Sequence, residues 1–220
     1  MKILFVSATL LELRPLLEIA VPDGDNKFSI TSQSGDTLEV LITGVGLVSM
    51  ATNLSLHLAK NNYDLVLNVG VAGAFNRQFP LGSLWQVSRD YLADLGVEMG
   101  QKFISMNQLG LSSESDILLF PRMEKHSDLL KDLPMAIGVS KNTGSGRVST
   151  IAYMQRQYKA EVESMEGAAF FYVCSKFECQ FAQLRAISNY VGERDKRKWD
   201  LKGSVTVLNE FLLKSFIENS

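Results

Sequence analysis

Short apolar runs alternate with amphipathic segments along the whole of this chain. Apolar runs of roughly four to eight residues are typical of buried strands, whereas apolar residues at helical spacing indicate amphipathic helices. We expect strands at residues 2–8, 28–32, 38–43, 64–68, 82–91, 135–140, near 162 and 181–187. We expect helices at residues 10–20, 47–61, 123–131, 151–158, 166–177 and 203–216.

This alternation predicts an α/β fold in which helices cover both faces of a mixed, mostly parallel central sheet. Residues 28–32 and 38–43 are expected to form a hairpin, whereas the weakly patterned segment 94–120 is expected to be rich in loops. The 220 residues suit one α/β domain, and neither a linker nor an internal repeat divides them. We therefore expect a single three-layer α/β/α domain that spans residues 1–220.

Composition and charge exclude several classes of protein. The formal net charge is -2, with both signs mixed along the chain, which argues against nucleic-acid binding. No stretch reaches the ~20 apolar residues of a membrane helix. Glu12, Arg14 and Pro15 interrupt the first apolar run too early for a signal peptide. Cys174 and Cys179 form neither a disulfide framework nor a metal-ligand pattern, so we expect a cytoplasmic protein without a metal ion.

Polar or small residues follow several predicted strands, where α/β sheets place ligands. Glu12 lies just past the first strand, where it is either a functional carboxylate or a solvated residue of the first helical turn. The Gly-Val-Gly at 44–46 is either a phosphate or sugar contact or a tight turn. The Gly-Val-Ala-Gly at 70–73 is expected to be a loop that lets a ligand approach the backbone, although simple packing explains it equally well.

Two acids lie at the start of the helix expected at 166–177. Glu163 and Glu166 flank Met165. Carboxylates at this place can bind a ribose diol, because each accepts several hydrogen bonds. They can equally complement the positive end of the helix.

The strand that follows this helix ends in a polar pair, Ser188-Asn189. Such a pair is either a ligand contact or a turn, since Ser and Asn favour turns. Arg194 and Asp195 come next, in a charged segment that is either a recognition loop or a solvated one.

Five motifs in this order resemble the nucleoside phosphorylase and nucleosidase superfamily, and they span nearly the whole chain. They are Glu12, Thr-Gly-Val-Gly at 43–46, Asn-Val-Gly-Val-Ala-Gly at 68–73, Glu-Ser-Met-Glu-Gly-Ala-Ala at 163–169 and Arg-Ala-Ile-Ser-Asn at 185–189. Within the superfamily the chain looks most like two hydrolase families, the methylthioadenosine/adenosylhomocysteine nucleosidases and the futalosine hydrolases. The resemblance implies a purine nucleoside substrate, no cofactor, and a homodimer or larger homo-oligomer.

The resemblance also implies roles for individual residues. Glu12 would activate a water nucleophile, and Asn189 would handle the purine. Met165 and Glu166 would bind the ribose. Further substrate contacts are implied at Val71, Ala72, Gly73, Glu163, Arg194 and Asp195.

Asn189 departs from the adenine-specific nucleosidases, which have Asp at this position. Its amide carries two N–H donors, which suit the N7 and 6-oxo acceptors of hypoxanthine better than adenine. A buried mismatch costs about 1–3 kcal/mol, which favours a 6-oxopurine. The resemblance therefore implies hydrolysis of futalosine in menaquinone biosynthesis, with hypoxanthine leaving as an anion or taking a proton from water or Asp195.

Futalosine carries a benzoate on the 5′ side of its sugar, and Arg is the best-shaped partner for a carboxylate. Arg77, Arg194 and Arg197 are the candidates. Three other activities fit the same motifs: a methylthioadenosine/adenosylhomocysteine nucleosidase, a purine nucleoside phosphorylase and a non-catalytic nucleoside-binding domain. Asn189 argues against the first, and the carboxylate of Glu12 would repel the phosphate that the second requires.

Overall fold

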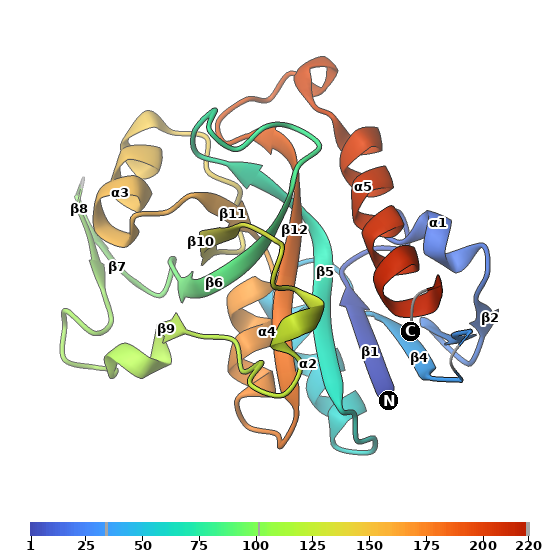
Figure 1. Ribbon diagram of the computed structural model, residues 1–220. Coiled ribbons are helices and arrows are strands. Elements are labelled where there is room, and N and C mark those ends of the chain that lie inside the picture. The colour runs from blue at the N-terminus through green and yellow to red at the C-terminus, as the bar shows by residue number, and fades with distance from the viewer. Residues whose placement is uncertain (34, 101, 219–220) are drawn as a thin grey trace.

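The computed structural model describes residues 1–33, 35–100 and 102–218, and its centre is one large sheet (Figure 1). The strand order is β11-β10-β6-β12-β5-β1-β4-β3-β2, with β9 beside β6, so this sheet has ten strands among the described residues. These strands are β1 (Lys2–Ser7), β2 (Val21–Pro22), β3 (Lys27–Thr31), β4 (Thr37–Ile42), β5 (Leu65–Ala74), β6 (Leu84–Leu92), β9 (Leu118–Leu119), β10 (Met135–Ser140), β11 (Val162–Ser164) and β12 (Gln180–Tyr190). The helices are α1 (Arg14–Leu17), α2 (Leu47–Leu58), α3 (Val148–Tyr158), α4 (Gly167–Cys174) and α5 (Leu201–Leu213).

Most neighbouring strands in the centre of the sheet run parallel. Strand β1 is parallel to both β4 and β5, and β12 is parallel to β5. Strand β6 enters antiparallel to β12, and β11 pairs antiparallel with the end of β5. The predicted α/β class with a mixed, mostly parallel sheet is therefore confirmed.

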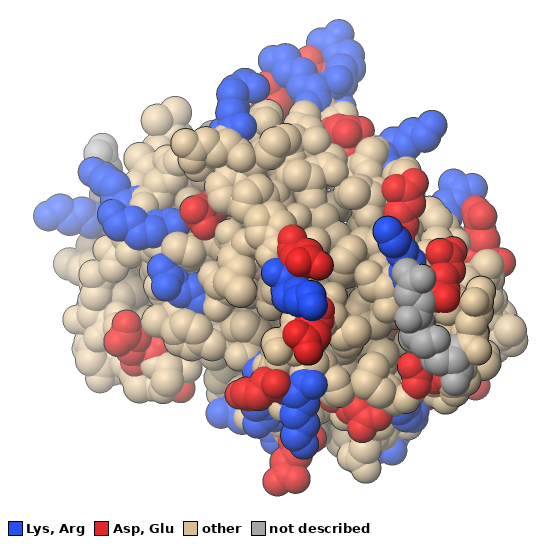
Figure 2. Space-filling view, viewed as in Figure 1, with Lys and Arg blue, Asp and Glu red and all other residues tan. Residues whose placement is uncertain are grey.

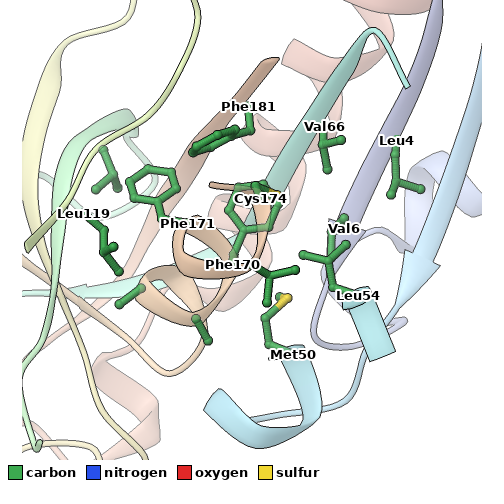
Figure 3. Close-up of a cluster of buried hydrophobic side chains, with 14 of the residues drawn as sticks. Leu4, Val6, Met50, Leu54, Val66, Leu119, Phe170, Phe171, Cys174 and Phe181 are labelled. Carbon is green, nitrogen blue, oxygen red and sulfur yellow. The ribbon is translucent and has the colours of Figure 1, made fainter. Parts of the chain in front are cut away.

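The two faces of the sheet bury alternate residues of each strand, as side-chain alternation requires. Leu4 and Val6 of β1 pack toward α2 and α4, where Met50, Leu54 and Phe170 meet them (Figure 3). The intervening residues Ile3 and Phe5 instead join a cluster with residues of α1 and α5. Helices on both faces of the sheet make the three layers predicted from the sequence.

The helix expected at 10–20 is confined to the short α1. Its N-cap residue is Leu13, and Pro15 occupies its first turn. Proline lacks an N–H and clashes within a helix, so it is tolerated only in the first turn and a helix cannot run from residue 10 through it. Thr9 lies outside the helix, and its N–H and hydroxyl donate to the carboxylate of Glu12.

Two segments expected to be a loop and a strand end are continuous strand. Strand β5 runs through residues 70–73, and β12 runs through Ser188 and Asn189. The two strands pair in parallel over this length, with a register shift between Ile187 and Asn189. Small side chains in β5 let neighbouring strands and side chains approach it closely, so glycine here marks close packing rather than a turn.

Of the segments 94–120 and 123–131, only the second contradicts the prediction. The first is rich in loops, as expected, and its regular elements are a hairpin of β7 (Gly96–Met99) and β8 (Lys102–Ser105), the 3-10 turn Glu114–Asp116 and the short strand β9. The second holds only a 3-10 turn, Ser127–Leu129. Arg122 forms a bridge with Phe181, which holds the start of this segment against β12 instead of in a helix. Throughout the described ranges, no helix is long and apolar enough to cross a membrane.

Candidate active site

The carboxyl ends of β4, β1, β5 and β12 lie along one edge of the sheet, because these strands are parallel. Ligands of α/β proteins bind at that edge. Glu12 follows β1, and Gly73 of β5 pairs with Asn189 on one side and with Glu163 of β11 on the other. The topology therefore gathers residues that are far apart in the sequence.

Glu12 is almost fully buried, with 7% of its surface exposed. Its Oε2 accepts hydrogen bonds from the Ser7 hydroxyl and from the N–H and hydroxyl of Thr9, all at 3.0 Å. Its Oε1 accepts from the N–H of Val71 at 3.0 Å. Donors from the end of β1, from the segment after it and from β5 thus fix the carboxylate, which in its ionised form can accept a proton from a water.

Glu166 immediately precedes α4 and is 6% exposed. Its Oε1 accepts a hydrogen bond from the N–H of Gly46 at 2.9 Å, so that glycine holds a carboxylate of the protein itself. Burial raises the pKa of Glu166 above its ordinary 4.5, although the Arg185 guanidinium and the Gly46 N–H oppose the rise. A carboxylate accepts about four hydrogen bonds, which leaves capacity for sugar hydroxyls. Met165 beside it is half-buried.

Arg185 is a buried cation near both carboxylates, and its sequence motif predicted no separate role for it. It is 2% exposed, donates through Nε to Gln183 Oε1 at 2.9 Å, and donates through Nη2 to Asn68 Oδ1. A side-chain carbon added at Gly70 would lie 2.5 Å from Glu12 Oε1 and 2.6 Å from Arg185 Nη1. Glycine at position 70 therefore leaves the space that the side chains of Glu12 and Arg185 occupy against β5. A charged residue inside an apolar strand run was the available signal, since buried arginines are rarely unpaired.

Glu163 is engaged by a loop before α3. Its Oε1 accepts from the N–H of Ser145 at 2.7 Å, and its Oε2 accepts from the Ser145 hydroxyl. Lys141 donates to the same hydroxyl at 3.3 Å. The carboxylates of Glu163 and Glu166, close in sequence, are thus held by different segments.

Asn189 presents its amide beside Gly73. Its Oδ1 lies 2.9 Å from the Ser188 hydroxyl, which also lies 3.3 Å from the carbonyl oxygen of Ala72. Its Nδ2 donates to the Tyr190 carbonyl at 3.2 Å and would be 3.2 Å from a side-chain carbon at Gly73. The serine thus directs the oxygen inward and leaves an N–H of the amide toward the edge of β5.

The charged residues after β12 are bound within their own loop or to the loop at 144–145. Arg194 donates to the carbonyls of Gly144 and Ser145, at 2.7 and 3.0 Å. Asp195 pairs with Arg197 at 2.8 Å, and this contact lowers the pKa of Asp195. Arg77 instead lies over the ring of Tyr190, with its Cζ 4.7 Å from the ring centroid.

A cavity of about 1020 Å³ adjoins this region. Ser145, Arg147 and Tyr153 line one part of it, and Phe103 of the β7–β8 hairpin lines another. Ser145 also binds the Glu163 carboxylate, which connects this lining to the candidate site, whereas Glu12, Glu166 and Asn189 do not line the cavity. In the part of the chain that the structure describes, no group of three or more His, Cys, Asp or Glu side chains is placed to hold a metal ion.

Known proteins similar to this chain identify its family. The Phosphorylase superfamily matches residues 2–216. A futalosine hydrolase of Thermus thermophilus is 32% identical over 76% of this chain and 76% of its own. A 5'-methylthioadenosine/S-adenosylhomocysteine nucleosidase of Staphylococcus haemolyticus is 28% identical over 82% of each chain.

Solved structures show the same fold. The native structure of futalosine hydrolase of Helicobacter pylori matches with a TM-score of 0.81 at 22% identity, and the match covers 98% of this chain and 96% of that one. The resemblance drawn from the five motifs is therefore confirmed. With a superfamily match over nearly its full length and a relative at 32% identity, this chain belongs to the phosphorylase superfamily.

Proposed function

We propose that this protein is an N-ribosyl hydrolase that cleaves futalosine to hypoxanthine and dehypoxanthine futalosine, in the futalosine route of menaquinone biosynthesis. The carrying observation is the pair of buried carboxylates, Glu12 and Glu166, held near Arg185 at the sheet edge where the amide of Asn189 also lies. The 32% identical relative from Thermus thermophilus, a futalosine hydrolase, supports this substrate.

Glu12 activates the water. Four hydrogen bonds hold its carboxylate, so the base is oriented before substrate arrives. A positioned base of this kind contributes about 10²- to 10⁴-fold to a rate. Arg185, close to the Glu12 carboxylate across Gly70, can donate to the same water.

Glu166 binds the ribose hydroxyls and stabilises the ribosyl cation that develops as the base leaves. Burial raises the pKa of Glu166, which means that the contacts of its carboxylate do not fully replace the water it loses. Such an anion gains more from a nearby developing positive charge than an exposed one does, because little water screens it.

Asn189 selects and releases the base. Its oxygen faces the Ser188 hydroxyl and one of its N–H groups donates to the Tyr190 carbonyl, so one N–H is left for a ligand. That donor suits either N7 or O6 of hypoxanthine, since both are acceptors, and a substrate that displaces the Tyr190 contact would receive both donors. Because the amide cannot transfer a proton, hypoxanthine leaves as an anion or takes a proton from water. The pairing of Asp195 with Arg197 argues against Asp195 as that acid.

Arg77 is the best of the three candidates for the benzoate. Arg194 donates to two backbone carbonyls and Arg197 pairs with Asp195, whereas Arg77 stacks on Tyr190, the neighbour of Asn189. We expect Arg77→Ala to raise the KM for futalosine about tenfold, the loss of one charge-assisted contact. The KM for inosine, which has the same base and no benzoate, should stay unchanged. Equal effects on both substrates would contradict this role.

A second activity, hydrolysis of methylthioadenosine or adenosylhomocysteine, is supported by the identity to the Staphylococcus haemolyticus nucleosidase. The two activities differ in the base they release. A substrate panel without phosphate should give hypoxanthine from futalosine at a kcat/KM at least tenfold above that for adenine release from methylthioadenosine, since a mismatch at Asn189 costs about 1–3 kcal/mol.

Three results of this panel would overturn the proposal. Preference for the adenine nucleoside would favour the second activity, and a rate that depends on added phosphate would favour a phosphorylase. Binding of hypoxanthine nucleosides without cleavage would make the protein a binding module. Asn189→Asp, a matched change of one polar group, should shift the preference toward methylthioadenosine.

The remaining expectations stay proposals. One sheet runs through residues 2–190, which supports a single domain over residues 1–220. The two cysteines are free, which fits a reducing cytoplasm. The family resemblance supports a homodimer or larger homo-oligomer, which sedimentation of the purified protein would measure.

A further inference from the structure

A chain of buried hydrogen bonds runs beneath the candidate active site, with Asp90 of β6 at its centre. Asp90 is 1% exposed, and the side chains that bind its carboxylate are themselves buried. Its carboxylate accepts from the Ser140 hydroxyl at 3.0 and 3.1 Å and from Gln183 Nε2 at 2.9 Å. Two arms therefore end on one carboxylate.

The first arm reaches the helix that begins after Glu166. The N–H of Ala168 donates to the Ser140 hydroxyl at 2.9 Å, and the N–H of Gly167 donates to the Ser164 hydroxyl at 3.2 Å. The two hydroxyls lie 3.0 Å apart. Because Ser140 must donate to Asp90, it accepts from Ala168 and Ser164, and every donor of this arm points toward the carboxylate.

The second arm reaches Arg185. Gln183 donates its amide N–H to Asp90 and turns its amide oxygen to Arg185 Nε, at 2.9 Å. An ionised carboxylate only accepts hydrogen bonds, so Asp90 decides which end of the Gln183 amide faces the arginine. Arg185 in turn donates to Asn68 and approaches Glu12 across Gly70.

The packing around Gly167 ties both arms together. A side-chain carbon at Gly167 would lie 2.0 Å from Gln183 Oε1 and 2.3 Å from Asp90 Oδ2. The start of α4 thus rests directly on the Asp90–Gln183 pair, and Glu166 is the residue immediately before it.

We propose that Asp90 is a positioning residue for the hydrolysis: as the common acceptor of both arms, it sets the position of Glu166 through α4 and the orientation of Arg185 through Gln183. This inference rests on the proposed function, because it concerns the groups assigned to water activation and ribose binding. Asp90 acts here through the direction of its hydrogen bonds, that is, by accepting at both arms, and not through the burial of its charge.

A charge swap tests that polarity. Asp90→Asn places an N–H where an acceptor is required, so one donor loses its partner. Asp90→Asn combined with Gln183→Glu restores a complete pattern. In this double variant the introduced amide can donate to the introduced carboxylate and still accept from Ser140, while that carboxylate accepts from Arg185. The control is Ser88→Ala, which removes a 3.1 Å hydrogen bond to the Ala136 carbonyl beside the same strand and leaves both arms intact.

Hypoxanthine release from futalosine is measured with the full-length chain at pH 8, above the Asp90 pKa of about 6. We expect Asp90→Asn to lower kcat about 10- to 100-fold, as loss of supporting groups typically does, with KM little changed. The double variant should recover most of that loss, and Ser88→Ala should keep the wild-type kcat. Melting temperatures of all four proteins separate folding from positioning.

Each outcome decides between the alternatives. A wild-type kcat in Asp90→Asn, or a folded double variant no more active than Asp90→Asn, would overturn the inference while leaving the proposed function intact. If Asp90→Asn does not fold, a folded and active double variant supports the inference, and a double variant that is unfolded or inactive overturns it. If the wild type releases adenine from methylthioadenosine instead, the proposed function fails and the same four proteins decide the role of Asp90 on that substrate.

Discussion

Two groups of charged side chains in this protein differ in their surroundings. The first lies in the loop between β12 and α5, where basic side chains gather at the top of the molecule (Figure 2). The second is the buried group of Glu12, Glu166, Arg185 and Asp90 at and beneath the sheet edge. The first group is the denser in the sequence, yet the second carries the proposed chemistry.

The difference lies in what compensates each charge. In the loop, Arg197 pairs with Asp195 and Lys198 pairs with Glu193, each at 2.8 Å, and water screens both pairs. In the buried group, neutral N–H and O–H donors hold the carboxylates, and burial raises the pKa of Glu166 and of Asp90. Exposed charges that already pair with a neighbour interact only weakly with a ligand, because water screens them. Buried charges without an ionic partner interact strongly with a ligand.

The largest expected effect is the loss of the buried base. Glu12→Gln should lower kcat/KM about 10²- to 10⁴-fold, because a neutral amide cannot take a proton from water. The rate of hypoxanthine release measures this, and circular dichroism checks the fold. Glu18→Gln, an exposed change in the same segment, is the matched control. An unchanged rate in Glu12→Gln would remove the buried group from the chemistry.

Opposite pH trends in stability should separate the two groups. Burial raises the pKa of Asp90 from 3.8 to about 6, so the native state binds a proton that the unfolded state releases. Stability from this group is therefore full below pH 3.8 and is lost as the pH rises through about 6. The unfolding free energy of wild type relative to Asp90→Asn should fall by roughly 3 kcal/mol over this range, measured by urea unfolding.

Asp195 is the exposed control for that trend. The Arg197 guanidinium lowers the pKa of Asp195, so its stabilising contribution is present above the ordinary pKa and is lost as the pH falls. Wild type relative to Asp195→Asn should thus change in the opposite direction and by much less, because solvent screens the pair. A flat profile for Asp90 would mean that its burial has no energetic consequence.

A larger side chain at Gly167, next to the buried group, should have the next largest effect on stability. Gly167→Ala places a methyl group 2.0 Å from Gln183 Oε1, and such overpacking typically costs about 1–3 kcal/mol of unfolding free energy. Gln183→Ala removes the opposing atom, so the two changes should be non-additive in a double-mutant cycle. Strict additivity would show that the two residues do not share the contact.

The smallest effect is expected in the exposed loop. Arg197→Ala removes an ion pair that solvent already screens, so the melting temperature and kcat/KM should stay close to the wild-type values. A tenfold loss of kcat in this variant would contradict the comparison and give the loop a direct part in the reaction.

The sequence predicted much of the fold because strand and helix patterns are local. Residues 135–140 match β10, and the hairpin at 28–32 and 38–43 agrees closely with β3 and β4. The continuous apolar run of β1 and the helical spacing in α2 are properties of short windows, so they are readable without a structure. The helix predicted at 10–20 was wrong because Pro15 is tolerated only in a first turn, which prevents a helix from starting at residue 10.

Long-range pairing limited the other predictions. Residues 70–73 look like a loop because they are small, but pairing with β12 and β11 makes them strand. Nothing local marks Asp90, Gln183 and Arg185 as one hydrogen-bonded group, because they lie on two strands that become neighbours only in the fold. Composition and periodicity do not report such contacts.

By itself, the sequence determined the α/β class, the order of the motifs, and the residue types Glu12, Glu166 and Asn189 that point to a nucleoside. Only the tertiary structure decided which charges are removed from water and what faces them. Glu163 and Glu166 lie three residues apart, yet one is held by Ser145 and the other by Gly46. The physical reason is that a carboxylate's partners and pKa depend on burial and on donors brought from distant segments, which only the packed chain provides.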